Sequence, residues 1–301
     1  MSQLPGFAVS RRALAFLFLI LSRGSLVHAQ EAFTVDVPGA TFTRVIGLNA
    51  QGDLCGGTQV NGVRLGFVRP SNGDLSTFAY PEAVFTQCRG INAAGQLVGA
   101  YQSADGVFHA FIKDGPEFLS IDVPEAIDTR GFGIGPRGQI VGRYTLPDLT
   151  VHGFFRGRDG SFLTIDAPGA IATEASGVTP QGDITGVYQT ADSRFHGYIL
   201  SQDGFETVDV PGALHTGSAT GGMWMSASGE LAGYHRPAGA PANRAFVRLR
   251  DGTIHTYLVP GSVDTCFFNI NERGDLVGRY IADGVEHGLY VERFGRRPPG
   301  Q

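Results

Sequence analysis

The chain has 301 residues, and its 44 Gly and many short apolar runs are typical of numerous strands and turns rather than long helices. Its formal net charge is −5, and removal of residues 1–29 would take away three Arg and no acid, leaving −8. This balance argues against nucleic acid and anionic membrane surfaces as partners.

The first 29 residues resemble a secretory signal peptide. Arg11 and Arg12 precede an apolar run over residues 13–21, and Val27-His28-Ala29 offers a cleavage site after Ala29. The apolar run is too short to span a bilayer. We therefore expect export to the periplasm or the extracellular space and no membrane span after cleavage; an uncleaved N-terminal anchor is the alternative.

From residue 33 onward the chain repeats one unit of about 43 residues. Three landmarks recur in register: a Pro, a turn Gly followed four residues later by another Gly, and a short aromatic or aliphatic motif such as His109-Ala110-Phe111. The recurring Pro residues are Pro38, Pro81, Pro124, Pro168, Pro211 and Pro260. The turn Gly residues are Gly52, Gly95, Gly138, Gly182, Gly229 and Gly274.

Each unit contains four predicted strands, a to d, which in copy two cover residues 89–92, 96–102, 108–113 and 118–123. Gly turns join a to b and c to d, a pattern typical of antiparallel hairpins. Four antiparallel strands in about 43 residues match one blade of a β-propeller. We therefore predict an all-β, six-bladed propeller of four-stranded antiparallel blades.

The two ends of the repeat region complete one unit. Residues 33–38 form a d strand without a preceding a, b or c, and residues 286–291 form a c strand without a following d. Pairing of these segments would close the ring and cover exposed strand edges. We expect a signal peptide over residues 1–29, a single propeller domain over residues 30–293 and a disordered tail over residues 294–301.

Two polar positions recur, and both are best interpreted as scaffold. A Thr follows each Pro by five residues, and we expect its hydroxyl to satisfy backbone groups, with the Asp two residues before the Pro as candidate partner. A His begins strand c in four copies and should be hydrogen-bonded within its own blade. These residues are Thr43, Thr86, Thr129, Thr173, Thr216 and Thr265, and His109, His152, His196 and His287.

The residue after the repeated Thr differs between copies: it is Arg44, Gln87, Arg130, Glu174, Gly217 or Cys266. Variation at a fixed place near the axis is what a binding site built on a repeat would show. Arg44, Arg130 and Glu174 are therefore candidates to hold a polar or anionic ligand; ordinary surface variation is the alternative.

Copy five departs most from the common pattern. It holds the only Trp, Trp224, on the inner strand, and a b–c loop that we expect to be lengthened after His235. Trp224 and His235 are candidates to stack on and bind a sugar or an aromatic ligand. A repacked blade with a benign insertion is the alternative.

The remaining motifs assign no chemistry. Cys55, Cys88 and Cys266 form no C-x-x-C pair and their number is odd, so the sequence supports neither a zinc site nor a disulfide framework. No nucleophile elbow, zincin, P-loop or calcium-loop motif occurs. We predict no catalytic residues, no metal and no cofactor.

The block Gly-Ile-Asn-x-x-Gly-x-Leu/Ile-Val-Gly together with His-Ala-Phe resembles the HAF repeat of predicted bacterial extracellular proteins. The resemblance covers residues 33–292 and is weakest at Leu65, Ser226 and Ala232. It implies export and transfers no activity.

We therefore expect an exported, monomeric, non-catalytic propeller that binds a protein or glycan at its axial face. A hydrolase or lyase with its site at the channel mouth and a purely structural envelope protein are the alternatives.

Overall fold

The computed structural model describes residues 13–14, 32–218 and 222–292, and every regular element in these ranges is a β-strand. The predicted all-β class is confirmed. Apart from the short strand β1 (Ala13–Leu14), which pairs with residues 32 and 33, the predicted signal peptide lies outside the described residues. The predicted tail over residues 294–301 also lies outside them.

The strands pair antiparallel in successive groups that follow the sequence repeat. In chain order they are β2 (Ala32–Val35); β3 (Ala40–Leu48), β4 (Leu54–Val60), β5 (Val63–Arg69), β6 (Ser76–Phe78); β7 (Phe85–Ile91), β8 (Leu97–Gln102), β9 (Phe108–Asp114), β10 (Glu117–Ile121); β11 (Asp128–Ile134), β12 (Ile140–Thr145), β13 (Val151–Arg156), β14 (Phe162–Ile165); β15 (Ala172–Val178), β16 (Ile184–Gln189), β17 (Phe195–Ser201), β18 (Gly204–Val208); β19 (Ala213–Thr216), β20 (Trp224–Met225), β21 (Leu231–Pro237), β22 (Arg244–Arg248), β23 (Ile254–Tyr257); β24 (Asp264–Ile270), β25 (Leu276–Ala282) and β26 (Val285–Val291).

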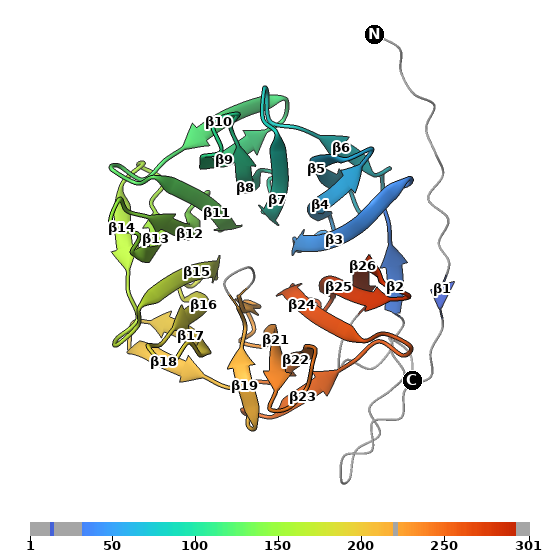
Figure 1. The fold of residues 1–301 in the computed structure, drawn as a ribbon, viewed down its shortest axis with the longest axis vertical. Coiled ribbons are helices and arrows are strands. Elements are labelled where there is room, and N and C mark those ends of the chain that lie inside the picture. Colours follow the sequence, from blue (N-terminus) through green and yellow to red (C-terminus); the bar gives the residue numbers. More distant parts are fainter. Residues whose placement is uncertain (1–12, 15–31, 219–221, 293–301) are drawn as a thin grey trace.

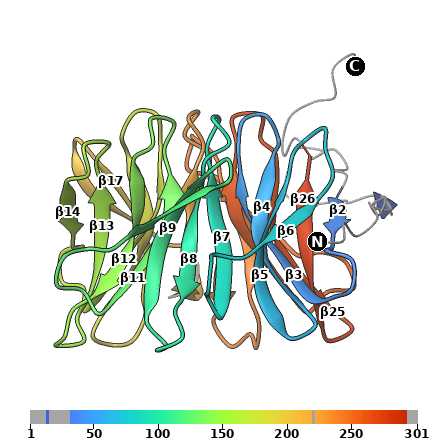
Figure 2. The same cartoon turned by 90° about the horizontal axis from the view of Figure 1, so that it is seen from above.

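The groups stand around a common axis, with the first strand of each group innermost (Figure 1). Turned by 90°, the sheets are seen side by side (Figure 2). β2 pairs antiparallel with β26, from Ala32 opposite Val291 to Val35 opposite Gly288. The first and last strands of the repeat region therefore lie in one sheet.

Copy five has an interrupted inner strand. Both β19 and β20 pair with β21. Met225 lies nine positions after Thr216, whereas Val178 lies five positions after Thr173. The loop between β21 and β22 is only one residue longer than its counterpart in copy four. The extra residues of copy five therefore lie mainly in the inner strand, and the prediction that they lengthen the b–c loop is largely wrong.

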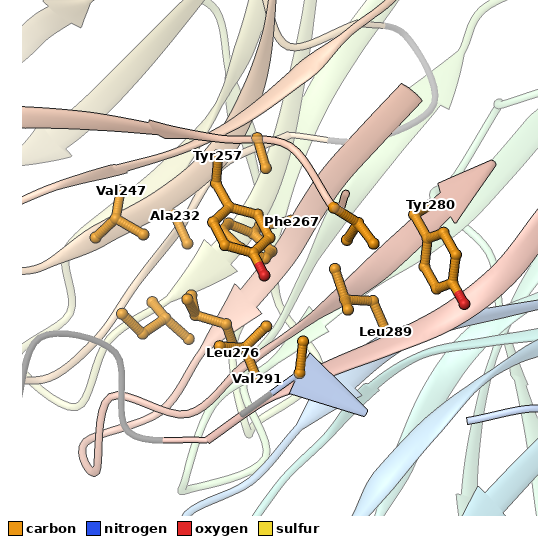
Figure 3. Packing of buried hydrophobic residues seen from close by; sticks show 12 residues of the cluster. Ala232, Val247, Tyr257, Phe267, Leu276, Tyr280, Leu289 and Val291 are labelled. Carbon is orange, nitrogen blue, oxygen red and sulfur yellow. The ribbon is translucent and has the colours of Figure 1, made fainter. Parts of the chain in front are cut away.

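The core lies between neighbouring sheets rather than in one central mass. The largest cluster combines side chains of β21, β22 and β23 with side chains of β24, β25 and β26, including Tyr257, Phe267 and Leu289 (Figure 3). Each third strand of the groups contributes one fully buried large side chain: Phe67, Phe111, Phe154, Tyr198, Phe246 and Leu289. Since every sheet is covered by its neighbours, apolar burial holds the sheets to one another.

The repeated Thr is part of this scaffold, although its partner differs from the one we expected. In each copy the Thr hydroxyl accepts the backbone N–H of the residue before the recurring Pro, as Thr173 does from Ala167 at 3.0 Å. The Asp two residues before the Pro instead contacts the repeated His. His152 Nδ1, for example, lies 2.8 Å from Asp166, and Tyr144 stacks on the His152 ring.

Asn side chains link the turns on the face opposite these Thr residues. Asn271 Nδ2 donates to the carbonyl oxygen of Asn49 at 3.1 Å, and Asn49 Nδ2 donates to the carbonyl oxygen of Asn92 at 3.0 Å. Asn92 Nδ2 donates in turn to the carbonyl oxygen of Gly135 at 3.4 Å. These bonds tie the last copy to the first and the first to the second, so they add polar contacts to the apolar core between sheets.

Candidate binding pocket at the axial face

The variable residue after the repeated Thr contacts strand b of the preceding copy. Arg143 on β12 donates from Nη1 to Glu174 Oε1 on β15 at 2.6 Å. At the interface between copies one and two, the equivalent positions are Gly57 on β4 and Gln87 on β7, and they are also in contact. At these two interfaces the variable residue is therefore covered by a residue of the preceding copy, and both members of the pair change from copy to copy while the scaffold stays fixed.

Arg44 lies in an ion-pair network between the last and first copies. Its Nε and Nη2 donate to the two carboxylate oxygens of Glu286 at 2.7 and 2.9 Å. Arg279 lies beside the same carboxylate, with its Nε 3.6 Å from Glu286 and its Nη1 2.8 Å from Asp264. A bidentate, partly buried pair of this kind fixes the position of the guanidinium group.

Arg130 lies at the interface between copies two and three, and Glu174 lies at the interface between copies three and four. Arg130 forms a bidentate pair with Asp128, and its guanidinium carbon lies 3.8 Å from the ring centroid of Phe108. Glu174 is buried, and burial raises its pKa to about 7 against the lowering effects of Arg143 and then Arg89. Because Glu174 does not line the cavity described below, it is not placed to exchange a proton with a ligand there.

An opening at this face lies beside Gly217, where the variable residue has no side chain. It is a cavity of about 270 Å³. It is lined by Arg44, Ser193, Phe195, His215, Gly217, Ser218, Tyr234, Arg236, Asn243, Cys266, Phe268 and Arg279. The lining joins residues from the beginning and the end of the chain, and no carboxylate is found among these residues.

Arg236 is the cation of this pocket for which the described residues supply no acidic partner. Within the described ranges its guanidinium has no hydrogen bond or ion pair, and its Nε is buried. Arg44 and Arg279, by contrast, are held by Glu286 and Asp264 behind the pocket wall. A buried N–H donor without a partner costs free energy that an anionic ligand would recover.

His215 offers a hydrogen-bond donor beside Arg236. The Phe195 backbone N–H donates to His215 Nδ1 at 3.2 Å, so the neutral ring carries its proton on Nε2. Burial lowers the pKa of His215, and the charge of Arg236 lowers it further, so the ring is neutral near pH 7. A ring held in this tautomer donates a hydrogen bond from Nε2 and cannot accept a proton there.

Trp224 occupies the axis rather than the open face. Its indole packs on Gly133 and Gly177, where an added Cβ would lie 2.9 Å from the Trp224 ring atoms. It lines a cavity of about 20 Å³ with Arg89 and Phe132, and a second cavity of about 90 Å³ at the turns of the opposite face. Trp224 therefore lines both of these small cavities, and it is not among the residues that line the pocket beside Gly217.

His235 is also placed away from the pocket. It is buried, and its ring meets Phe246 edge to face with 6.3 Å between the ring centroids. Its neighbours Tyr234 and Arg236 face the pocket, because successive side chains of β21 point to opposite sides. Of the five candidate ligand-binding residues predicted from the sequence, only Arg44 lines this pocket, together with Gly217 and Cys266 from the same variable position.

Sequence reasoning missed the contributions of Arg236, Arg279 and Phe268. These residues lie on β21, β25 and β24 and converge with Arg44 of β3 only when the copies are arranged around the axis. One signal was present in the sequence: Gly217 is the only Gly among the residues that follow the repeated Thr.

The described part of the chain contains no helix long and apolar enough to cross a bilayer. The same residues contain no group of three or more His, Cys, Asp or Glu side chains arranged to hold a metal ion.

The chain is similar in fold to solved β-propellers. No model of a known protein family matches it, and no curated protein sequence matches it. A putative TolB from Agrobacterium tumefaciens aligns with a TM-score of 0.60 and 14% identity over 87% of this chain and 93% of that chain. A fungal lectin from Aleuria aurantia, described as a six-bladed β-propeller with a novel fucose recognition mode, aligns with a TM-score of 0.51 and 14% identity over 89% and 100%. A gluconolactonase from Xanthomonas campestris aligns with a TM-score of 0.52 and 11% identity over 88% and 90%.

Proposed function

We propose that the protein is an exported, non-catalytic, six-bladed β-propeller that binds an acidic glycan at its axial face. The pairing of β2 with β26 supports a ring closed by the two chain ends. The HAF-like repeat and the signal-like segment near Ala29 support export. The glycan, rather than a protein, is favoured by the size and the charge of the pocket that contains Gly217.

The observation that carries this proposal is the uncompensated Arg236 in the pocket of about 270 Å³. This volume lies just below the range of about 300–1,000 Å³ for drug-sized ligands, so it suits a single sugar residue or a small acid. Arg236 would pair with a carboxylate, and His215 Nε2 would donate to a hydroxyl or carboxylate oxygen. Phe195 and Phe268 supply the apolar surface on which sugar rings pack.

A hydrolase or lyase acting at this face is the second candidate. Glu174, with a pKa near 7 and Arg143 beside it, has the protonation properties of a general acid. It is 4% exposed and does not line the pocket, and His215 is held as a donor. Binding without turnover therefore fits the geometry better.

The test is calorimetric titration of the chain lacking residues 1–29 with galacturonate and glucuronate oligosaccharides, and with neutral galactose and glucose oligosaccharides. We expect the acidic oligosaccharides to bind at least tenfold more tightly. Arg236→Gln should weaken acidic binding by about 10–100-fold, since a hydrogen bond to a charged group contributes about 1.5–3 kcal/mol.

Arg248→Gln provides the matched control, because Arg248 pairs with exposed Glu206 and does not line the pocket. It should bind like the wild type. Equal affinity for acidic and neutral oligosaccharides, or an unchanged affinity of Arg236→Gln, would contradict the proposal. Release of shortened or unsaturated products during the titration would support the enzyme instead.

A further inference from the structure

Cys55 and Cys88 face each other across the interface between the first and second copies. Cys55 lies on β4 and Cys88 on β7, and their Sγ atoms are 2.6 Å apart. Both side chains are fully buried and share one apolar cluster with Ile91 and Leu97. Non-bonded carbon atoms pack about 3.5–4.0 Å apart, and sulfur is larger than carbon, so this separation is too short for two independent thiols.

The same two positions are in contact at other interfaces of the ring. The residue equivalent to Cys55 is Val141 in copy three, and the residue equivalent to Cys88 is Ala175 in copy four; these two pack in one core cluster. Val277 and Val45 share another core cluster at the interface between the last and first copies. The scaffold therefore brings these positions together whatever residues occupy them, and only one interface places cysteine at both.

We propose that Cys55 and Cys88 form a disulfide that links the first two blades of the exported protein. Two thiols lose two protons and two electrons, and one S–S bond forms. The oxidant is a disulfide-carrying thiol compound, such as oxidised glutathione or an oxidised dithiol protein of the export compartment. A cysteine thiolate attacks that disulfide and releases one thiol; the second cysteine then attacks the mixed disulfide and releases the other thiol.

Burial determines when this bond forms and which cysteines take part. Neither thiol is exposed once the copies have packed, and burial raises the pKa of Cys88, so the folded pair is a poor nucleophile. The exchange must therefore precede the packing of β4 on β7. Cys266 cannot compete, because it lies in a different cluster with Tyr234 and Phe268.

The test uses the full chain, reduced and unfolded in guanidinium chloride and refolded in buffers with graded ratios of reduced to oxidised glutathione. Remaining thiols are then alkylated under denaturing conditions, and the peptides are mapped without reduction. We expect a single linked peptide pair containing Cys55 and Cys88, lighter by two hydrogen atoms, with Cys266 alkylated. Reduction should lower the thermal midpoint of the wild type by about 5–10 °C.

The double substitution Cys55→Val and Cys88→Ala is the matched control, because it reproduces the Val141 and Ala175 pair of another interface. It should fold, and its thermal midpoint should not respond to reductant. Alkylation of all three cysteines after refolding in excess oxidised glutathione would overturn the proposal, as would linkage of Cys266 to either partner. Because the glutathione buffer supplies the oxidant, the result does not depend on export or on glycan binding.

Discussion

Glu174 makes stability depend on pH in a direction that can be measured. Its carboxyl group is 4% exposed and accepts one hydrogen bond, from Arg143 Nη1 at 2.6 Å. Burial raises its pKa from the usual 4.5 to about 7. The folded chain therefore binds the Glu174 proton more tightly than the unfolded chain does. Stability from this group is fully present below about pH 4.5 and is lost as the pH rises through about 7.

The size of the effect follows from the same two pKa values. One pKa unit corresponds to about 1.36 kcal/mol, so ionisation of Glu174 in the folded chain costs about 3 kcal/mol in all. Most of this loss, about 2–3 kcal/mol, falls between pH 5 and pH 8. Glu174→Gln keeps an oxygen that accepts from Arg143 and removes the titration. The fall in the free energy of unfolding between pH 5 and pH 8 should therefore be smaller in this variant by about 2–3 kcal/mol.

The assay is urea denaturation of wild type, Glu174→Gln and Glu206→Gln at intervals between pH 5 and pH 8. Glu206 is an exposed carboxylate paired with Arg248, so its variant should follow the wild-type pH dependence. If the free energy of unfolding of Glu174→Gln changes with pH as the wild type does, the carboxyl group ionises freely in the folded chain and the reasoning from burial is refuted.

Two further substitutions test the interpretation of the repeated and irregular residues. Trp224→Ala should lower the free energy of unfolding by about 2–3 kcal/mol, because the half-buried indole that packs on Gly177 is lost. The affinity of this variant for acidic oligosaccharides should stay within twofold of the wild type. A complete loss of binding would show that Trp224 contributes to the binding site. Thr173→Val should cost about 1–3 kcal/mol, because it leaves the buried N–H of Ala167 unpaired. Thermal or urea unfolding should show a change below about 0.5 kcal/mol for the exposed control Thr77→Val, and equal effects of the two substitutions would contradict a structural role of the Thr173 hydroxyl.

The strands could be predicted from the sequence because the same strand and turn pattern recurs in every copy of the repeat. In copy two the predicted third strand covers residues 108–113, and the observed β9 spans Phe108–Asp114. The inner strand is longer than predicted, since β7 begins at Phe85 rather than at residue 89. It therefore includes Thr86, which the sequence placed in the connection before the strand. A Gly turn marks the end of the inner strand in every copy, whereas no breaker marks its beginning.

The site was harder to predict, because its residues come from strands that lie far apart in the sequence. Arg44 and Arg279 come from opposite ends of the chain and share Glu286. The repeat alignment identified Arg44 as variable, but it gave no distance between copies that are not adjacent in sequence. The contact between Cys55 and Cys88 was equally hard to predict, although these residues are closer in sequence. They occupy different strands of successive copies, and only the packing of β4 on β7 shows that their sulfur atoms face each other.

The pocket arises where the sequence of copy five departs from the repeat. At the interface of copies three and four, Arg143 and Glu174 fill the space with a buried, hydrogen-bonded pair. At the next interface the corresponding residues are Val187 and Gly217, and Gly217 lines the cavity of about 270 Å³. The cavity is polar because Arg236 reaches it from the neighbouring strand, and no acid among the described residues balances its charge. A repeat protein can thus gain a charged cavity by losing one side chain, while the Thr contact of the scaffold, which Thr216 makes with the Val210 N–H in this copy, stays unchanged.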